Sequence, residues 1–226
     1  DGSQKTEVGG LHPIAIGSDE TNLHQEPSRT SAFSLRTSEA AELVQLLNTY
    51  IITPFAKGFI LIHQQAAHER VLYDQLKSAA KGKPIATQRS MFPVTLELAP
   101  ADAVILQELM TDLQELGYMI EPFGKNSFVI QGTPADLEAG NEKNIIDSLL
   151  EQYKHFSNEL KFSKREKLVR SLAKQQSLKT GIRLTEREMR QLVNDLFACE
   201  QPNSTPDGTP TYLEFKQEQL EKMFRG

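Results

Sequence analysis

The sequence predicts an α+β fold, and three stretches of the chain support that prediction. Residues 59–62 form a run of four apolar side chains, which is typical of a strand buried on both faces. Residues 66–80 then show an apolar side at helical spacing, so we expect a strand that runs directly into a helix. Residues 88–158 show strand, helix, strand, strand and helix patterns in that order, and we expect them to form a compact unit inserted in the chain.

The composition limits the classes of protein to consider. Of the 226 residues, 38% are hydrophobic and 24% are charged, so the chain can bury a sizeable core. The net charge of -5 does not indicate nucleic-acid binding by the chain as a whole. Cys199 is the one cysteine, which excludes a disulfide within the chain, and no apolar run approaches the roughly 20 residues that span a bilayer. We therefore expect a protein of a reducing compartment, most simply the bacterial cytoplasm, with no membrane partner.

The first part of the chain is expected to contain little regular structure. Residues 1–33 are rich in Ser, Thr, Gly, Gln and Glu and lack apolar periodicity, so we interpret them as a linker or disordered tail after a preceding segment. Residues 38–44 could form a helical turn. Residues 46–54 then read as a strand, which we expect to pair with residues 58–62 as a hairpin.

Local signals define the elements of the inserted unit. Residues 91–98 alternate apolar and polar side chains, as in an edge strand with one buried side. Residues 100–116 are predicted as a helix, because a proline suits the first turn and a glycine follows the last. Residues 118–123 and 127–131 read as a hairpin, and residues 144–156 read as an amphipathic helix.

The charge balance changes in the last third of the chain. Residues 161–183 contain eight lysines and arginines against one glutamate, a balance of about +7. Such a run either contacts DNA phosphates or forms a solvated helix face. Residues 185–188 form a capping-box pattern that begins a further helix, residues 209–215 read as a strand, and a short helix follows. The residues that we consider for DNA contact are Lys164, Arg165, Lys167 and Arg170.

The best candidate site lies where the apolar strand meets the helix. His63, Gln65, His68 and Glu69 occur there within seven residues. The end of the strand lies beside the helix N-terminus, so polar side chains converge, and the helix N-terminus favours nearby anions. The alternative is that these groups are hydrogen-bonded residues of an ordinary strand–helix junction.

The same stretch resembles a known family. Residues 63–74 read His-Gln-Gln-Ala-Ala-His-Glu-Arg-Val-Leu-Tyr-Asp, which is similar to the Asp-Gln-His-Ala-x-x-Glu-x-x-x-x-Glu motif in the C-terminal domain of nuclease-active MutL mismatch-repair proteins. Residues 206–211, Pro-Asp-Gly-Thr-Pro-Thr, resemble that family's Pro-His-Gly-Arg-Pro-Thr segment. Residues 48–52 and 220–225 also look like the family, so the resemblance extends over roughly residues 34–226.

The resemblance implies a domain organisation. A dimerisation subdomain would comprise residues 34–87 and 159–226, and residues 88–158 would form an inserted regulatory subdomain. The linker at residues 1–33 would connect them to an N-terminal ATPase, which alone would bind ATP.

The resemblance also implies a function in DNA mismatch repair. The domain would homodimerise, join two ATPase arms around DNA, and recruit a MutS-type mismatch recognition protein and the β sliding clamp. DNA would be bound through the full-length protein, in the bacterial cytoplasm and close to the nucleoid. Two other hypotheses remain. The second is a metal-dependent nuclease, and the third is an α+β binding module that is unrelated to this family.

The metal-binding positions of the family are altered in this chain. Nuclease-active members bind a divalent metal through imidazole, thiolate and carboxylate groups, which suit Zn or Mn. Glutamine is a poor ligand for such metals, and threonine cannot replace a thiolate. A further family cysteine falls near Lys174. The residues at the family's ligand positions, in the order Asp, His, Glu, Cys and His, are His63, Gln65, Glu69, Thr205 and Asp207.

Three of these residues could still form a metal site. His63, Glu69 and Asp207 would bind Zn or Mn, and a metal-bound water could then attack a DNA phosphate. On this alternative the domain is a metal-dependent endonuclease with a degenerate motif. Cys199 would contribute only if its loop folded back. We otherwise predict no cofactor and no catalytic residue.

A second motif suggests a protein partner. Residues 88–93 read Gln-Arg-Ser-Met-Phe-Pro, similar to the Gln-x-x-hydrophobic-Phe peptides with which bacterial proteins bind the β sliding clamp. Gln88 would form hydrogen bonds, Met91 and Phe92 would fill an apolar cleft, and Pro93 ends the motif. The alternative is that these residues simply begin the edge strand.

Overall fold

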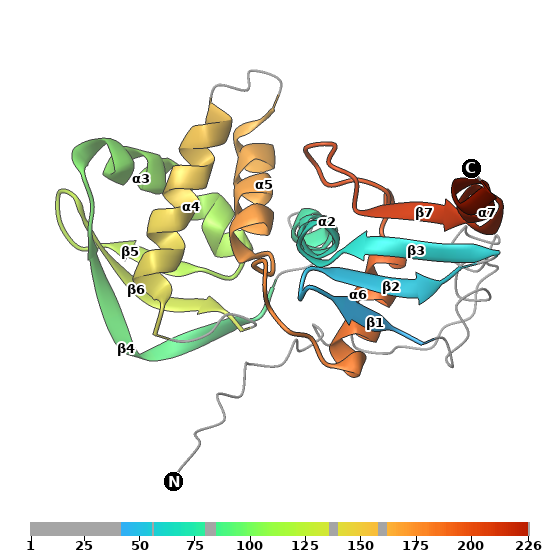
Figure 1. The fold of residues 1–226 in the computed structure, drawn as a ribbon. Coiled ribbons are helices and arrows are strands. Elements are labelled where there is room, and N and C mark those ends of the chain that lie inside the picture. The colour runs from blue at the N-terminus through green and yellow to red at the C-terminus, as the bar shows by residue number, and fades with distance from the viewer. Residues whose placement is uncertain (1–41, 56, 80–84, 136–139, 158–161, 226) are drawn as a thin grey trace, which may run out of the picture.

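The structure is a computed structural model that describes residues 42–55, 57–79, 85–135, 140–157 and 162–225. It contains helices and two antiparallel sheets, so the predicted α+β class is confirmed (Figure 1). The predicted tail at residues 1–33 lies outside the described residues.

The strands are β1 Val44–Leu46, β2 Tyr50–Pro54, β3 Gly58–His63, β4 Thr87–Glu97, β5 Met119–Pro122, β6 Ser127–Pro134 and β7 Tyr212–Lys216. The helices are α2 Gln64–Ala79, α3 Pro100–Glu115, α4 Glu142–Ser157, α5 Lys164–Gln176, α6 Glu186–Ala198 and α7 Gln217–Arg225.

The first sheet joins distant parts of the chain. Its strand order is β1-β2-β3-β7, and all neighbouring strands are antiparallel. The hairpin of β2 and β3 was predicted, and β7 adds to it by pairing Tyr212 with Ile62. Figure 1 shows β7 and α7 beside β3, although more than 140 residues separate them in the sequence.

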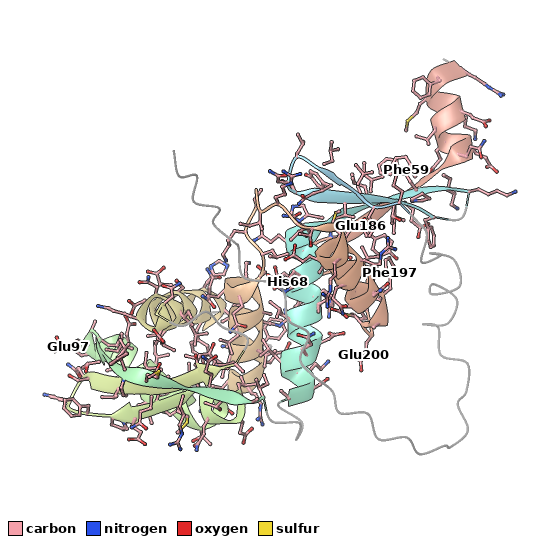
Figure 2. All side chains as sticks on the ribbon, turned by 90° about the horizontal axis from the view of Figure 1, so that it is seen from below. Phe59, His68, Glu97, Glu186, Phe197 and Glu200 are labelled. Atoms are coloured by element: carbon pink, nitrogen blue, oxygen red, sulfur yellow. The ribbon has the colours of Figure 1, made fainter. Side chains whose placement is uncertain are left out.

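Helices cover one face of this sheet. Ile51, Ile60 and Ile62 are fully buried under apolar side chains of α2 and α6, such as Ala67 and Leu192. Figure 2 shows α2 and α6 on the same side of the sheet, with Phe197 marking α6.

The opposite face corrects one prediction. We expected β3 to be buried on both faces, but Phe59 and Leu61 are only partly buried. An antiparallel sheet commonly packs one face on the core and leaves the other to solvent. We call the face that carries these two residues the outer face of the four-stranded sheet.

The predicted strand at residues 46–54 is wrong at its beginning. Leu47 and Asn48 have positive φ angles of 54° and 47°, and the N–H of Thr49 donates to the carbonyl of Leu46 at 3.1 Å. A tight hairpin turn therefore separates β1 from β2. The predicted helical turn at residues 38–44 is also wrong at Val44, which begins β1, while residues 38–41 lie outside the described residues.

The second sheet has the strand order β4-β6-β5, with β4 at an edge as predicted. The predicted hairpin is formed by β5 and β6, and the predicted helices at 100–116 and 144–156 are formed by α3 and α4. Apolar side chains of this sheet and of α3, α4 and α5 belong to one continuous core. α2 contributes to that core through Tyr73 and Leu76 and to the other core through Ala67 and Val71. It is therefore the helix that the two cores share.

The predicted end of α3 and the predicted start of α6 are confirmed by the local backbone geometry and hydrogen bonds. Gly117 ends α3 with a φ of 88°, a left-handed conformation that favours glycine. Thr185 and Glu188 form the capping box at the start of α6, each side chain accepting a hydrogen bond from the other's backbone N–H. Among the described helices, none combines the length and the apolar composition that crossing a membrane requires.

Candidate functional site

The polar residues at the strand–helix junction are hydrogen-bonded within the protein. His63 ends β3, and its Nδ1 accepts the backbone N–H of Ala66 at 3.2 Å. Its ring also lies edge-on to Tyr50, with 5.3 Å between the ring centroids. Gln65 accepts a hydrogen bond from the hydroxyl of Thr180 at 3.1 Å. Both side chains therefore help to fix the start of α2 and its neighbouring loop.

His68 is a hydrogen-bond acceptor as well. Its Nδ1 accepts the backbone N–H of Leu178 at 3.0 Å, which fixes the segment between α5 and α6. Burial lowers the pKa of His68 to about 4. The imidazole is thus neutral at pH 7, as its acceptor role requires.

Gln64 was not among the predicted site residues, yet its side chain makes three hydrogen bonds to distant parts of the chain. Its side chain is fully buried. It donates to the carbonyls of Asn48 at 2.8 Å and Ile182 at 3.0 Å, and it accepts from Gln45 at 2.8 Å. Gln64 therefore joins the β1–β2 turn to the segment before α6. A glutamine at the first position of a helix next to a buried strand was the one signal that could have indicated it.

The carboxylates of the junction lie among positive charges. Glu69 is only 9% exposed, and burial is the largest cause that raises the pKa of its carboxyl. Asp207 raises this pKa further, whereas Lys174, Arg70 and Arg170 lower it. Glu69 thus lies near a second carboxylate and three side-chain cations.

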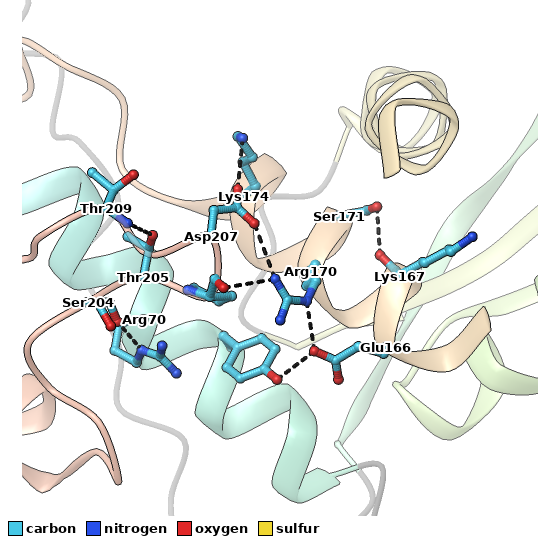
Figure 3. A network of polar contacts seen from close by, with 12 residues as sticks. Arg70, Glu166, Lys167, Arg170, Ser171, Lys174, Ser204, Thr205, Asp207 and Thr209 are labelled. Carbon is cyan, nitrogen blue, oxygen red and sulfur yellow. Dashed lines mark hydrogen bonds and ion pairs between the residues drawn. The ribbon is translucent and has the colours of Figure 1, made fainter. Parts of the chain in front are cut away.

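Asp207 is paired directly with two of these cations. Its Oδ2 is 3.2 Å from Nζ of Lys174, and its Oδ1 is 3.3 Å from a guanidinium nitrogen of Arg170. Arg170 also donates to the carbonyl of Pro206 at 2.9 Å. Figure 3 shows that Lys174 and Arg170, both on α5, point toward the loop that carries Asp207.

The network continues into α2. Nε of Arg170 donates to Oε1 of Glu166 at 2.7 Å, and that oxygen also accepts the hydroxyl of Tyr73 at 2.7 Å. The guanidinium carbon of Arg170 lies 3.9 Å from the ring centroid of Phe162. Arg70 on α2 donates to the carbonyl of Ser204 at 2.5 Å (Figure 3). These contacts join α2, α5 and the loop before β7, and we call them the α2–α5–loop network.

The candidate metal ligands have other partners in the protein. In the part of the chain that the structure describes, no three His, Cys, Asp or Glu side chains are grouped so that they could hold one. His63, Glu69 and Asp207 do not form such a group, and Nδ1 of His63 accepts the backbone N–H of Ala66. Lys174, near which the resemblance aligns a family cysteine, instead presents its ammonium group to Asp207. Protein cations thus supply the positive charge that a metal would bring.

The side chains of Thr205 and Cys199 are hydrogen-bonded to backbone groups of the protein. The buried Thr205 accepts the backbone N–H of Thr209 at 3.1 Å. Cys199 follows α6, where burial and then Asp74 raise the pKa of its thiol. The Cys199 thiol is therefore protonated at pH 7.

Acidic groups accompany the basic run. Lys164 donates to the carbonyl of Glu108 at 2.6 Å and lies 3.8 Å from Asp112, and Arg165 pairs with Glu115. Lys167 lies on the same helix, α5. Most of the residues considered for DNA contact, Arg170 included, therefore have acidic partners within the protein.

The clamp-like motif lies in an irregular part of β4. Gln88 pairs with Thr133 of β6, but the register shifts between Arg89 and Val94. Within this β-bulge the side chains of Met91 and Phe92 are 89% and 83% exposed. The motif residues therefore begin an edge strand and also present two large apolar side chains to solvent.

Comparison with known proteins identifies the family. A family model described as the MutL C terminal dimerisation domain matches residues 43–184. The DNA mismatch repair protein MutL of Pelodictyon phaeoclathratiforme is 34% identical over 180 residues, which cover 80% of this chain and 29% of that protein. The MutL proteins of Chlorobium chlorochromatii and Flavobacterium psychrophilum are 30% and 31% identical, over 99% and 95% of this chain and 37% and 35% of their own lengths. This chain spans about a third of the length of the curated relatives it matches. It belongs to the family of MutL C terminal dimerisation domains.

Proposed function

We propose that this chain joins two copies of a mismatch-repair protein through the outer face of its four-stranded sheet. The observation that carries the proposal is a row of aliphatic side chains across all four strands. The cross-strand pairs are Val44 with Ile52, Ile52 with Leu61, and Leu61 with Leu213. Residues directly opposite each other lie on the same face of a sheet, so these four form one continuous apolar strip.

The strip is open to solvent. Val44 and Leu213, at its two ends, are 48% and 52% exposed, and Leu46, two residues after Val44 on β1, is 44% exposed. Phe59 and Phe215 extend the strip, with their rings stacked at a centroid distance of 4.9 Å. A contiguous exposed apolar surface of this kind is characteristic of a protein–protein interface.

A second copy of the chain is the partner that best fits this surface. A two-fold axis brings the same patch together on both subunits, so an apolar strip on each copy would be covered by its equivalent. The family to which the chain belongs is described as a dimerisation domain, which supports the same partner.

The test changes one residue of the strip and compares it with an exposed residue elsewhere. Leu213→Glu places a charge in the strip, whereas Val104→Glu places the same charge on α3, where Val104 is 58% exposed. We expect sedimentation at concentrations on the order of 10 µM to give dimers for the original protein and Val104→Glu. Leu213→Glu should sediment as a folded monomer. A Leu213→Glu dimer as stable as the original would exclude this face, and a monomeric original protein would exclude self-association.

In a full-length protein this dimer would serve DNA mismatch repair. The relatives carry the name of a DNA mismatch repair protein, and this chain covers about a third of their length. The dimer would connect two N-terminal ATPase arms around DNA and present surfaces to a MutS-type protein, in the bacterial cytoplasm near the nucleoid. The dimerisation subdomain would comprise residues 34–87 and 159–226, with residues 88–158 as the inserted regulatory subdomain.

A second function, docking on the β sliding clamp, is supported by the β4 bulge. Two large apolar side chains that protrude from an edge strand suit insertion into an apolar cleft. Gln88 and Pro93 would complete the contact. The exposure of Met91 and Phe92 favours this role over a purely structural one, because a residue of the core would be buried.

This docking has a matched control. Replacing Met91 and Phe92 together with Ala should weaken binding to purified bacterial β clamp by on the order of a hundredfold, as measured by surface plasmon resonance. Phe123→Ala, at a residue that is 73% exposed on another loop, should leave the affinity unchanged. Equal affinity of the double variant and the original protein would rule out the bulge as the docking site.

The endonuclease alternative receives no comparable support. Three protein cations lie around Glu69 and Asp207, and the remaining ligand positions carry Gln65 and Thr205. We therefore assign the junction a structural role.

A further inference from the structure

The β4 bulge has a buried anchor. The hydroxyl of Ser90, between the predicted clamp-contact residues Gln88 and Met91, lies 3.2 Å from Oε1 of Glu142. Glu142 is the first residue of α4 and is only 3% exposed. Neighbouring groups cover this carboxylate, so hydrogen bonds from the protein replace those that water would make to it.

Backbone groups keep the carboxylate of Glu142 in place. Oε1 also accepts the N–H of Gly140 at 3.0 Å, and Gly140 has a φ of +91°, a conformation that favours glycine. The N–H of Gly140, the N–H of Glu142 itself and the hydroxyl of Ser90 lower the pKa of the Glu142 carboxyl. The N-terminus of α4 favours the same negative charge. The acceptor is therefore charged at pH 7 and fixed before any partner arrives.

The anchor lies beside the part of β4 that lacks regular pairing. Ladder pairing with β6 ends at Arg89 and resumes at Val94, so Ser90 to Pro93 have no partners in that ladder. Met91 and Phe92, which follow Ser90, are 89% and 83% exposed. Without a restraint, this segment would sample many conformations, and binding would have to order them at a cost in affinity.

We infer that Glu142 is a positioning residue for clamp docking, which holds Ser90 and thereby presents Met91 and Phe92 in one arrangement. The inference rests on the proposed docking and extends it, because it names a residue outside the motif that sets the affinity. Glu142 touches no partner itself. It acts by restricting the free state of the bulge, the effect known as preorganisation.

The experiment is built on a double-mutant cycle, in which the affinity of purified bacterial β clamp is measured for the original protein, Glu142→Ala, Ser90→Ala and the double variant. We expect each single variant to bind roughly three- to tenfold more weakly. The double variant should bind no more weakly than Glu142→Ala alone, because Glu142→Ala already removes the contact that Ser90→Ala would remove. Glu142→Gln, which keeps an acceptor oxygen, should recover part of the loss.

Two controls separate positioning from a general structural effect. Gln131→Ala removes an exposed side-chain hydrogen bond to Glu121 in the same sheet and should leave the affinity unchanged. Nitrogen-15 relaxation of the free protein should show lower order parameters at Met91 and Phe92 in Glu142→Ala than in the original. The values for residues 94–97, which pair with β6, should be the same in both proteins.

The outcomes for the two proposals differ. If the clamp binds the original protein and Glu142→Ala equally well, the positioning role is excluded and the docking proposal stands. If the clamp binds neither the original protein nor any variant, the docking proposal is excluded and the positioning role with it. Unchanged order parameters in Glu142→Ala would exclude the restraint, even if the affinity fell.

Discussion

The strand–helix junction and the outer surfaces of the sheets differ in the partners of their side chains. At the junction, residues whose types suggest chemistry are bound to the protein itself. His63 and His68 accept backbone N–H groups, and Asp207 is paired with Lys174 and Arg170. On the two sheets, by contrast, large apolar side chains such as Leu213 and Phe92 are exposed to solvent.

This difference indicates which regions are suited to partners. A polar group that already has its hydrogen bonds gains little from a ligand, and disrupting those bonds would cost free energy. An apolar side chain in water gains free energy whenever a partner covers it. We therefore propose binding surfaces at the outer face and the β4 bulge, whereas the contacts of the junction hold α2, α5 and the loop before β7 together.

Arg170 offers the strongest test of this comparison at the junction. Its side chain is 11% exposed and contacts Glu166, Asp207 and the carbonyl of Pro206. Arg170→Met keeps much of the apolar volume but removes hydrogen bonds and ion pairs to two partly buried carboxylates and one carbonyl, so we expect the free energy of unfolding to fall by about 3 kcal/mol. Urea unfolding at one fixed protein concentration would measure the loss, because the stability of a dimer depends on concentration.

Arg190 provides a matched control. It forms the same type of pair, to a glutamate four residues earlier, at 2.8 Å compared with 2.7 Å for Arg170. The Glu186 side chain of that pair is 71% exposed, and exposed pairs contribute little. We expect Arg190→Met to change the free energy of unfolding by less than about 1 kcal/mol. Equal losses in both variants would contradict a special role for the α2–α5–loop network.

The sequence could predict features that depend on neighbouring residues. The ends of α3 and the start of α6 follow from Pro100, Gly117, Thr185 and Glu188, whose effects act within one helical turn. The hairpin of β2 and β3 likewise follows from two apolar runs close in the chain. These elements required no knowledge of tertiary contacts.

The contacts that decide the role of the junction join distant residues. Lys174 and Asp207 are 33 positions apart, and Gln64 reaches Ile182 across 118 positions. The sequence therefore presented the basic run and the acidic loop separately and could not pair them. The apolar run of β3 was equally ambiguous, because the same four residues suit a strand covered by helices or a strand that a second subunit covers.

His68 gives a smaller test of the same comparison, through the pH dependence of stability. Its pKa is about 4 in the folded protein, against an ordinary value of 6.5. Between these values the unfolded chain binds a proton that the folded protein excludes, so His68 lowers the stability progressively as the pH falls from 6.5 to 4. We expect this contribution to reach about 2–3 kcal/mol at pH 4.

The measurement compares the unfolding free energies of the original protein and His68→Gln from pH 7 to pH 4. Glutamine cannot gain the charge but can still accept the N–H of Leu178, so the variant should lose less stability in acid than the original protein does. His155→Gln, at an exposed position on α4, controls for the loss of a histidine as such. Taking the difference between the two proteins removes the effect of Glu69, whose raised pKa acts in the opposite direction. Parallel curves for the original protein and His68→Gln would mean that the imidazole is accessible to protons. The junction would then be open to solvent, as the proposed binding surfaces are, and the distinction between the two regions would fail.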